Sequence, residues 1–228
     1  MSFKLEDLPY QRQAIDAAIR LFEGQQRNYF DFDLQGDCFP NRLNLTRKDI
    51  VANVEKISAE NGISHGEAKV CIEPDYSIEM ETGTGKTLVY LRTIYELSRE
   101  YGFTKFIILV PSVPIREGVL DTIESFRPQL ERLYHIPLHA FEYDSKKLPK
   151  VKHFIEGSDL QVMIMTTHSF NADDNIINRP DRDDSPDGYS YWQALSKVRP
   201  VIIMDEPQEG MDTDNLRPRL NALDPIAR

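Results

Sequence analysis

The residues best suited to chemistry lie in one short stretch, Thr82-Gly83-Thr84-Gly85-Lys86-Thr87. Its glycines permit backbone angles closed to other residues and let the chain approach a ligand closely. The amides of Gly85, Lys86 and Thr87 would converge at a helix N-terminus, where the helix dipole favours an anion. The Lys86 ammonium would reach the β- and γ-phosphates of a nucleotide, and the Thr87 hydroxyl would hold Mg²⁺. The stretch therefore predicts a phosphate loop that binds ATP with Mg²⁺.

The pattern departs from the usual phosphate-loop form at one position. The form G-x-x-x-x-G-K-S/T places glycine at position 80, where this chain has Met80. The departure is tolerable because the amides that hold phosphate come mostly from the second half of the loop. The alternative is a chance Gly-Lys-Thr at the start of a helix. A strand-like run at 76–80 and a helix-like run at 87–100 on either side favour the phosphate loop.

A pair of carboxylates supplies the second candidate set. Asp205 and Glu206 directly follow the apolar run Val201–Met204, which has the length of a buried strand. Asp205 would hold Mg²⁺ opposite Thr87, and Glu206 would orient and deprotonate the attacking water. An isolated Asp-Glu is usually a solvated surface pair. Behind a buried strand, in a chain that also has Gly-Lys-Thr, the pair predicts the other half of a nucleotide site.

The elements that must position these residues alternate between strands and helices from Tyr76 onward. Continuous apolar runs predict strands buried on both faces, which is typical of a parallel sheet covered by helices. We expect strands at 76–80, 106–110, 138–143, 162–165 and 201–204, and helices at 87–100, 115–126 and 189–198. The polar, aspartate-rich stretch 171–188 predicts a surface loop. The fold class is therefore α/β.

Two further helices are expected before the sheet begins. Residues 8–23 carry apolar side chains at helical spacing, with Pro9 near the start and Gly24 at the end. Thr46-Arg47-Lys48-Asp49 resembles a capping box that opens a helix to about Asn61. Residues 25–75 as a whole are predicted to form an insert packed beside the first helix, with no chemistry assigned.

Composition bounds the class of protein. The chain has 228 residues and a formal net charge of −10, which predicts one α/β domain without a fold-wide basic surface for nucleic acid. The two cysteines, Cys38 and Cys71, form no C-x-x-C motif and indicate a reducing, cytoplasmic compartment. No apolar run suggests secretion or a membrane partner. The five histidines show no metal-ligand spacing.

Three motifs together resemble the motor part of the Res subunit of type III restriction-modification enzymes. They are Met80 to Thr87, Val110 to Val119, and Asp205-Glu206-Pro207-Gln208; the stretch 169–179 adds to the likeness. The resemblance implies a RecA-like P-loop NTPase domain of superfamily 2 that acts on DNA beside a modification methyltransferase. Residues 8–13 are similar to the Gln-containing lead-in of such helicases, and this implies that Gln11 reads adenine through its amide.

The resemblance also implies two sets of nucleic-acid contacts. By position they are Pro111, Ser112 and Arg116 after the second strand, and Thr167, His168 and Ser169 after the fourth. Hydroxyls, amides and one guanidinium suit contacts to the phosphate backbone without sequence readout. The alternative is structural: a helix cap at Ser112, a surface Arg116 and a solvated His168.

The chain lacks several motifs of the wider family, and this indicates how much of such a protein residues 1–228 represent. No Ser-Ala-Thr motif, second motor domain or nuclease follows Asp205-Glu206 before Arg228. We therefore expect residues 1–228 to be the first motor domain of a longer protein. Two alternatives stay open: the motor of another superfamily 2 helicase, in repair or RNA remodelling, and a nucleotide-binding module without turnover.

Overall fold

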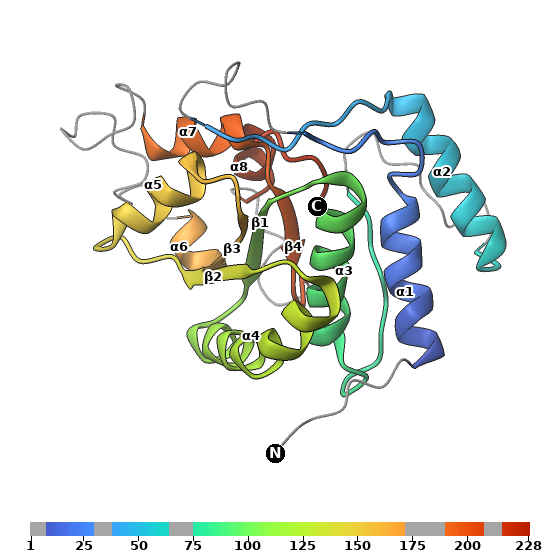
Figure 1. The fold of residues 1–228 in the computed structure, drawn as a ribbon, viewed down its shortest axis with the longest axis horizontal. Helices are drawn as coiled ribbons and strands as arrows, with labels where there is room; N and C mark the ends of the chain where they lie inside the picture. Colours follow the sequence, from blue (N-terminus) through green and yellow to red (C-terminus); the bar gives the residue numbers. More distant parts are fainter. Residues whose placement is uncertain (1–7, 30–37, 64–74, 172–189, 208–215) are drawn as a thin grey trace.

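A parallel sheet of four strands forms the centre of the protein (Figure 1). The computed structural model describes residues 8–29, 38–63, 75–171, 190–207 and 216–228. The strands are β1 (Lys105–Val110), β2 (Leu138–Glu142), β3 (Leu160–Thr166) and β4 (Val201–Met204), in the spatial order β2-β3-β1-β4. All three pairings are parallel. The structure thus confirms the α/β class and the strands predicted from 106 to 204.

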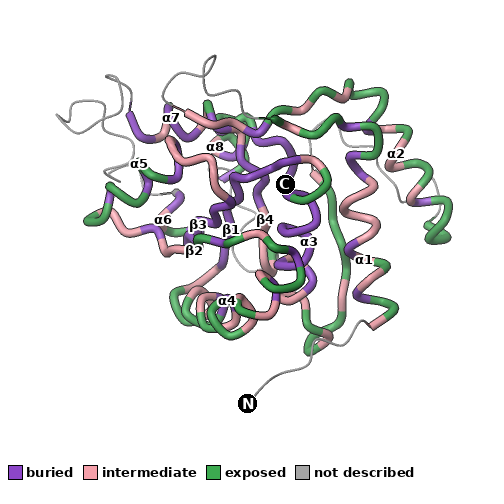
Figure 2. Tube along the Cα trace, viewed as in Figure 1, coloured by how far each residue is buried: buried purple, intermediate pink, exposed green. Residues whose placement is uncertain are grey.

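Helices cover both faces of the sheet. Alternate side chains of β1 point to opposite faces, so Phe106 and Ile108 join one core and Ile107 and Leu109 join the other. Both cores are buried along the strands, as Figure 2 shows. The first core includes residues of α3 (Lys86–Tyr101) and α4 (Val113–Tyr134), together with Leu21 and Phe22, which directly follow α1 (Pro9–Arg20). Helix α1 itself packs against α3. The second core packs against α5 (Leu148–Glu156), α6 (Thr167–Asn171), α7 (Tyr191–Val198) and α8 (Leu216–Ala222).

The register of the sheet aligns the carboxyl ends of its strands. Val110 lies opposite Thr166, and Leu109 lies opposite Met204. Because the strands are parallel, the residues after Val110, Thr166 and Met204 emerge at the same edge, which is the lower edge in Figure 1. The loop before α3 reaches this edge as well. The sheet therefore gathers the candidate residues at one end of the molecule.

The predicted strand at 76–80 is wrong. These residues have no strand pairing, and their one backbone bond to a distant described residue runs from the Tyr76 N–H to the Arg228 carbonyl, at 2.8 Å. The position beside β4 is taken by Ala227, which bridges Val201, and the Arg228 guanidinium pairs with Asp75. Residues 76–79 are exposed. A strand needs a ladder on at least one side, and a single bond does not make one.

Other boundaries differ where packing overrides local signals. Helix α4 does not end at Phe126 but continues through Pro128 to Tyr134, because Leu130 and Tyr134 bury their side chains in the first core. Tyr134 also stacks on Tyr95, with ring centroids 5.0 Å apart. Helices α5, α6 and α8 were not predicted.

Helix α2 (Arg47–Glu60) lies against the outer side of α1 (Figure 1). The predicted capping box is confirmed: the Asp49 N–H donates to the Thr46 hydroxyl, and the Thr46 N–H donates to the Asp49 carboxylate at 2.7 Å. The Asn53 amide donates to the Leu21 carbonyl at the end of α1, at 3.0 Å. Among the described helices, none is long and apolar enough to cross a membrane.

Candidate functional site

The loop before α3 has the backbone that phosphate binding requires. Gly83 and Gly85 have φ angles of +79° and +85°, which side chains other than glycine rarely adopt. Gly85 is the N-cap of α3, so the helix begins at Lys86. The first turn of α3 carries no acidic residue and no side-chain cap. Its N-terminal amides therefore have no anionic partner within the helix and are oriented to receive an anion.

Helix α1 braces this loop through its first turn. The Gln11 side-chain amide donates to the Thr84 carbonyl at 2.8 Å, and the Tyr10 hydroxyl donates to the same oxygen at 3.2 Å. Within the loop, the Thr84 hydroxyl donates to the Glu81 carbonyl at 2.6 Å. A Cβ atom at Gly85 would lie 2.7 Å from Gln11 Nε2, so a side chain at this position would displace the Gln11 amide from the Thr84 carbonyl. Gln11 thus lies at the loop, and its contact with adenine stays a prediction.

The predicted catalytic residues meet at the end of β4. The Lys86 ammonium lies 3.3 Å from Glu206 Oε1, and both side chains are about one-third exposed, at 31% and 30%. The Asp205 N–H donates to the Leu109 carbonyl at 3.0 Å, which extends the β1–β4 ladder to the carboxylate pair. The structure therefore brings Lys86 and the two carboxylates into one cluster, although 119 residues separate Lys86 from Asp205 along the chain.

Asp205 and Glu206 differ in their surroundings. Burial raises the pKa of Asp205 above its ordinary value, and the neighbouring Glu206 charge raises it further, while Lys86 lowers it. A half-buried carboxylate in this state gains from a cation placed beside it. Glu206 has a φ of +56°, in the left-handed region that a non-glycine residue adopts at some cost in energy.

The Mg²⁺ ligands proposed from the sequence are Thr87 and Asp205. The Tyr90 side chain, one turn further along α3, is close to both of them. Within the described ranges, no three or more His, Cys, Asp or Glu side chains form a metal site by themselves. Mg²⁺ is commonly held by one or two protein oxygens together with water and substrate phosphate, and Thr87 and Asp205 would supply such oxygens.

The residues after β1 lie at the same edge of the sheet, and their burial and side-chain contacts differ from one residue to the next. Pro111 and Ser112 are half-buried, and Ser112 is the N-cap of α4 without a side-chain capping bond. The Arg116 guanidinium lies 2.7 Å from the Glu117 carboxylate and 3.0 Å from the Glu142 carboxylate at the end of β2. Arg116 therefore already has two carboxylate partners, and its contact with nucleic acid stays a prediction.

The residues after β3 differ in accessibility. Thr167 is buried, at 7% exposure, whereas His168 is exposed. The Ser169 N–H donates to the Thr166 hydroxyl at 3.2 Å, and the two hydroxyls lie 2.9 Å apart. These bonds cap the first turn of α6 and hold Ser169 in place. Of the three predicted contacts, His168 is the one that faces solvent. The related stretch 173–179 and Gln208 lie outside the described residues.

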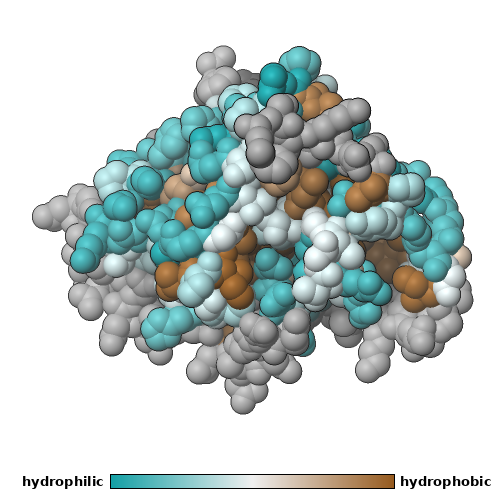
Figure 3. Space-filling model, turned by 90° about the horizontal axis from the view of Figure 1, so that it is seen from below, coloured by the Kyte–Doolittle hydropathy of each residue, from teal (hydrophilic) through white to brown (hydrophobic). Residues whose placement is uncertain are grey.

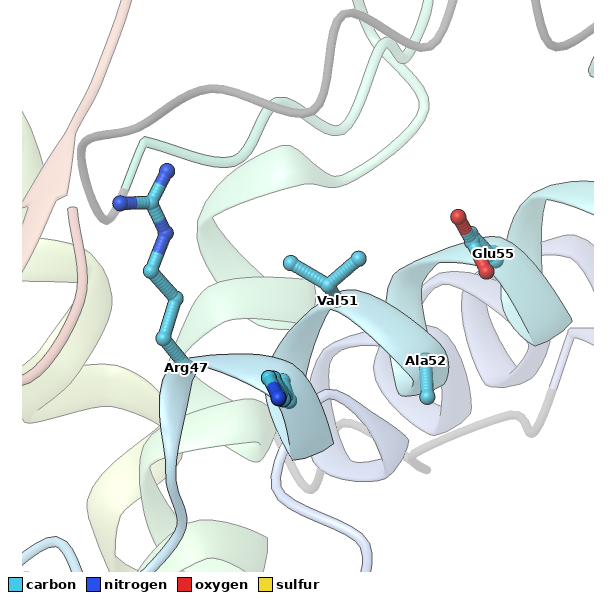
Figure 4. A pocket seen from close by; sticks show the side chains of 5 residues that line it. Arg47, Val51, Ala52 and Glu55 are labelled. Carbon is cyan, nitrogen blue, oxygen red and sulfur yellow. The ribbon is translucent and has the colours of Figure 1, made fainter.

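The surface at this end of the molecule is mainly polar (Figure 3). Figure 3 looks at the end of the molecule to which the strands point, where hydrophilic side chains predominate with hydrophobic residues scattered between them. A separate hollow of about 420 Å³ lies along α2 (Figure 4). It is lined by Arg47, Lys48, Val51, Ala52 and Glu55. No candidate residue lines that hollow, so it is separate from the candidate site.

Known proteins resemble this chain over most of its length. The family model described as "Type III restriction enzyme, res subunit" matches residues 4–217. The EcoPI Res subunit of Escherichia phage P1 is 29% identical over 231 residues, which cover 90% of this chain and 23% of that protein. The EcoP15I Res subunit of Escherichia coli is 28% identical over 235 residues, with the same coverage. The StyLTI Res subunit of Salmonella typhimurium is 28% identical over 245 residues, covering 99% and 22%.

Proposed function

Since this chain belongs to the family of type III restriction enzyme Res subunits, with a RecA-like, helicase-like motor fold, we propose that it binds and hydrolyses ATP with Mg²⁺. One observation carries the proposal. Lys86, at the start of α3, contacts Glu206, at the end of β4, beside a phosphate loop whose two glycines have positive φ. This arrangement supplies a cation, helix amides and two carboxylates around the same space.

Each residue has a proposed part in that chemistry. Lys86 and the first amides of α3 hold the phosphates, and Thr87 and Asp205 hold Mg²⁺, which neutralises charge on the phosphates when bound. Glu206 orients the attacking water and takes its proton. Gln11 reads adenine with the part of its amide that Thr84 does not use. In the described state Glu206 neutralises Lys86, so nucleotide phosphate would replace the Glu206 carboxylate at the ammonium.

DNA and a modification methyltransferase are the proposed partners. The chain spans about a quarter of the length of the curated relatives that it matches, so translocation and cleavage of DNA are proposals about the whole protein. We propose residues 1–228 as its first motor domain, working in the cytoplasm. The DNA backbone would pass along the lower edge of the sheet, over Pro111, Ser112, Arg116, Thr167, His168 and Ser169. Arg116 would exchange Glu142 for a DNA phosphate.

Substitution of Lys86 tests the proposal. Lys86→Ala removes the main positive charge facing the phosphates, so Mg²⁺·ATP should bind about 10- to 150-fold more weakly, or roughly 1.5–3 kcal/mol. Titration calorimetry measures both affinities. Lys152→Ala is the matched control, because Lys152 is a half-exposed lysine of α5 that pairs with Glu156. Equal ATP affinities for the wild type and Lys86→Ala would sink the phosphate-loop assignment.

A further inference from the structure

Tyr90 carries a buried hydroxyl that no hydrogen bond satisfies. It lies on α3 three residues after Thr87, hence on the same face of the helix. The hydroxyl oxygen is shielded from solvent and has no hydrogen-bond partner of ordinary geometry among the described residues. Leaving such a group unpaired costs stability, and native proteins rarely do so without a reason. A partner that arrives with a ligand is one such reason.

The polar groups around Tyr90 are those of the nucleotide site. The Thr87 side chain and the Asp205 carboxylate are the two polar groups that act on the Tyr90 phenol. Burial is the main cause that raises the pKa of Tyr90 above its ordinary value; the Thr87 side chain lowers this pKa and the Asp205 charge raises it. A neutral phenol can accept one hydrogen bond and donate another.

We propose that Tyr90 is a positioning residue for the Mg²⁺ ligands: its oxygen accepts the Thr87 hydroxyl hydrogen and its own hydrogen points to Asp205. A hydroxyl that ligates a cation must turn its lone pairs toward the cation and its hydrogen away. Tyr90 offers that hydrogen an acceptor inside the protein, and it fixes the direction of the Asp205 carboxylate. This inference rests on the proposed function, and it adds a residue that the sequence motifs do not contain.

A second tyrosine of α3 separates this role from packing. Tyr95 also has a buried hydroxyl without a hydrogen-bond partner among the described residues, and burial raises the pKa of its phenol as well. Its ring stacks on Tyr134, in the core between α3 and α4. Neither Thr87 nor Asp205 is among the groups that affect the Tyr95 phenol. Tyr90→Phe and Tyr95→Phe therefore each remove one buried phenol hydroxyl from α3. Only the Tyr90 hydroxyl lies at the proposed nucleotide site.

Calorimetric titration of Tyr90→Phe with ATP, in the presence of Mg²⁺ and again with a chelator, tests the proposal. We expect Mg²⁺·ATP to bind about 5-fold more weakly, the effect of one lost neutral hydrogen bond, and metal-free ATP to bind within about 2-fold of the wild type. Tyr95→Phe should leave both affinities within about 2-fold. Thermal unfolding of both variants verifies that each remains folded.

The outcomes distinguish this inference from the function beneath it. If the wild type binds Mg²⁺·ATP and Tyr90→Phe binds it with the same affinity, the role of Tyr90 is overturned. The proposed function then still stands. An equal loss with and without Mg²⁺ would also overturn it, because the hydroxyl would then not act through the metal ligands. If the wild type itself does not bind ATP, the proposed function fails and takes this inference with it.

Discussion

Glu206→Gln should improve ATP binding while it abolishes most hydrolysis. The Glu206 carboxylate lies 3.3 Å from the Lys86 ammonium, and in the proposed complex it would compete with a nucleotide phosphate for that ammonium. It also adds negative charge beside Asp205. The substitution keeps the shape of the side chain and removes its charge, so both effects favour an incoming polyphosphate. Hydrolysis, by contrast, should be lost, because a glutamine amide cannot act as a general base and take the proton of the attacking water.

The magnitude follows from the exposure of the pair. Lys86 and Glu206 are each about one-third exposed, so solvent screens their attraction, and the pair is worth about 0.5–1 kcal/mol. Release of this competition should tighten Mg²⁺·ATP binding by about 2- to 5-fold. Loss of the general base should slow hydrolysis by about 10²-fold or more in a form of the enzyme that turns over.

Calorimetric titration at low salt and again at about 1 M salt measures the first effect. The gain should shrink at the higher ionic strength, where the Debye length is about 3 Å. Glu100→Gln is the matched control, because it removes the same charge at the far end of α3, where Glu100 is exposed and pairs with Arg99. Binding that weakens 10-fold or more in Glu206→Gln would refute the reasoning, since Glu206 would then be a metal ligand. That loss is instead expected for Asp205→Asn, and only with Mg²⁺ present.

Two further predictions concern the scaffold. Burial lowers the pKa of Lys105 to about 8, from 10.5 in the unfolded chain, so between these values the unfolded state binds a proton that the folded state does not. The free energy of unfolding of the wild type should therefore rise relative to Lys105→Met, by about 2 kcal/mol from pH 8 to roughly pH 9.5, as followed by urea titration. Gly85→Ala should destabilise the fold more than Gly83→Ala in thermal unfolding. Both positions have positive φ, but only the Cβ at 85 would meet Gln11, whereas the space at 83 is open.

The strands of the central sheet could be predicted because buried strands consist of apolar residues. Val201–Met204 and the apolar part of β1 are continuous apolar runs, and a strand covered on both faces needs no alternation. The convergence of the site also follows from the sequence, since parallel strands place their carboxyl ends at one edge. The register that pairs Leu109 with Met204 carries Asp205 there.

What could not be predicted depends on partners far away in the chain. Residues 76–80 look like a strand, yet strand formation requires a ladder, and their described backbone partner is Arg228, more than 140 residues later. Pro128 discourages a helix locally, and α4 continues through it because Leu130 and Tyr134 gain burial against the first core. Tyr90 matches no motif. Its spacing of three residues from Thr87 places it on the same face of α3, but only the fold shows that its hydroxyl is buried near Asp205.

The two cations proposed to meet anionic ligands are already paired with carboxylates inside the protein. Lys86 and Arg116, the cations proposed to meet nucleotide and DNA phosphate, each contact an internal carboxylate, Glu206 or Glu142. Ligand binding therefore exchanges one ion pair for another, and the net gain is a small difference between two similar terms. At Lys86 the exchange favours the ligand, because a polyphosphate carries several charges and meets the amides of α3 as well. At Arg116 a single DNA phosphate competes with two carboxylates in a chain of net charge −10. DNA contact at this edge should accordingly be weak and strongly dependent on salt, unless other protein surface adds cations along the same track.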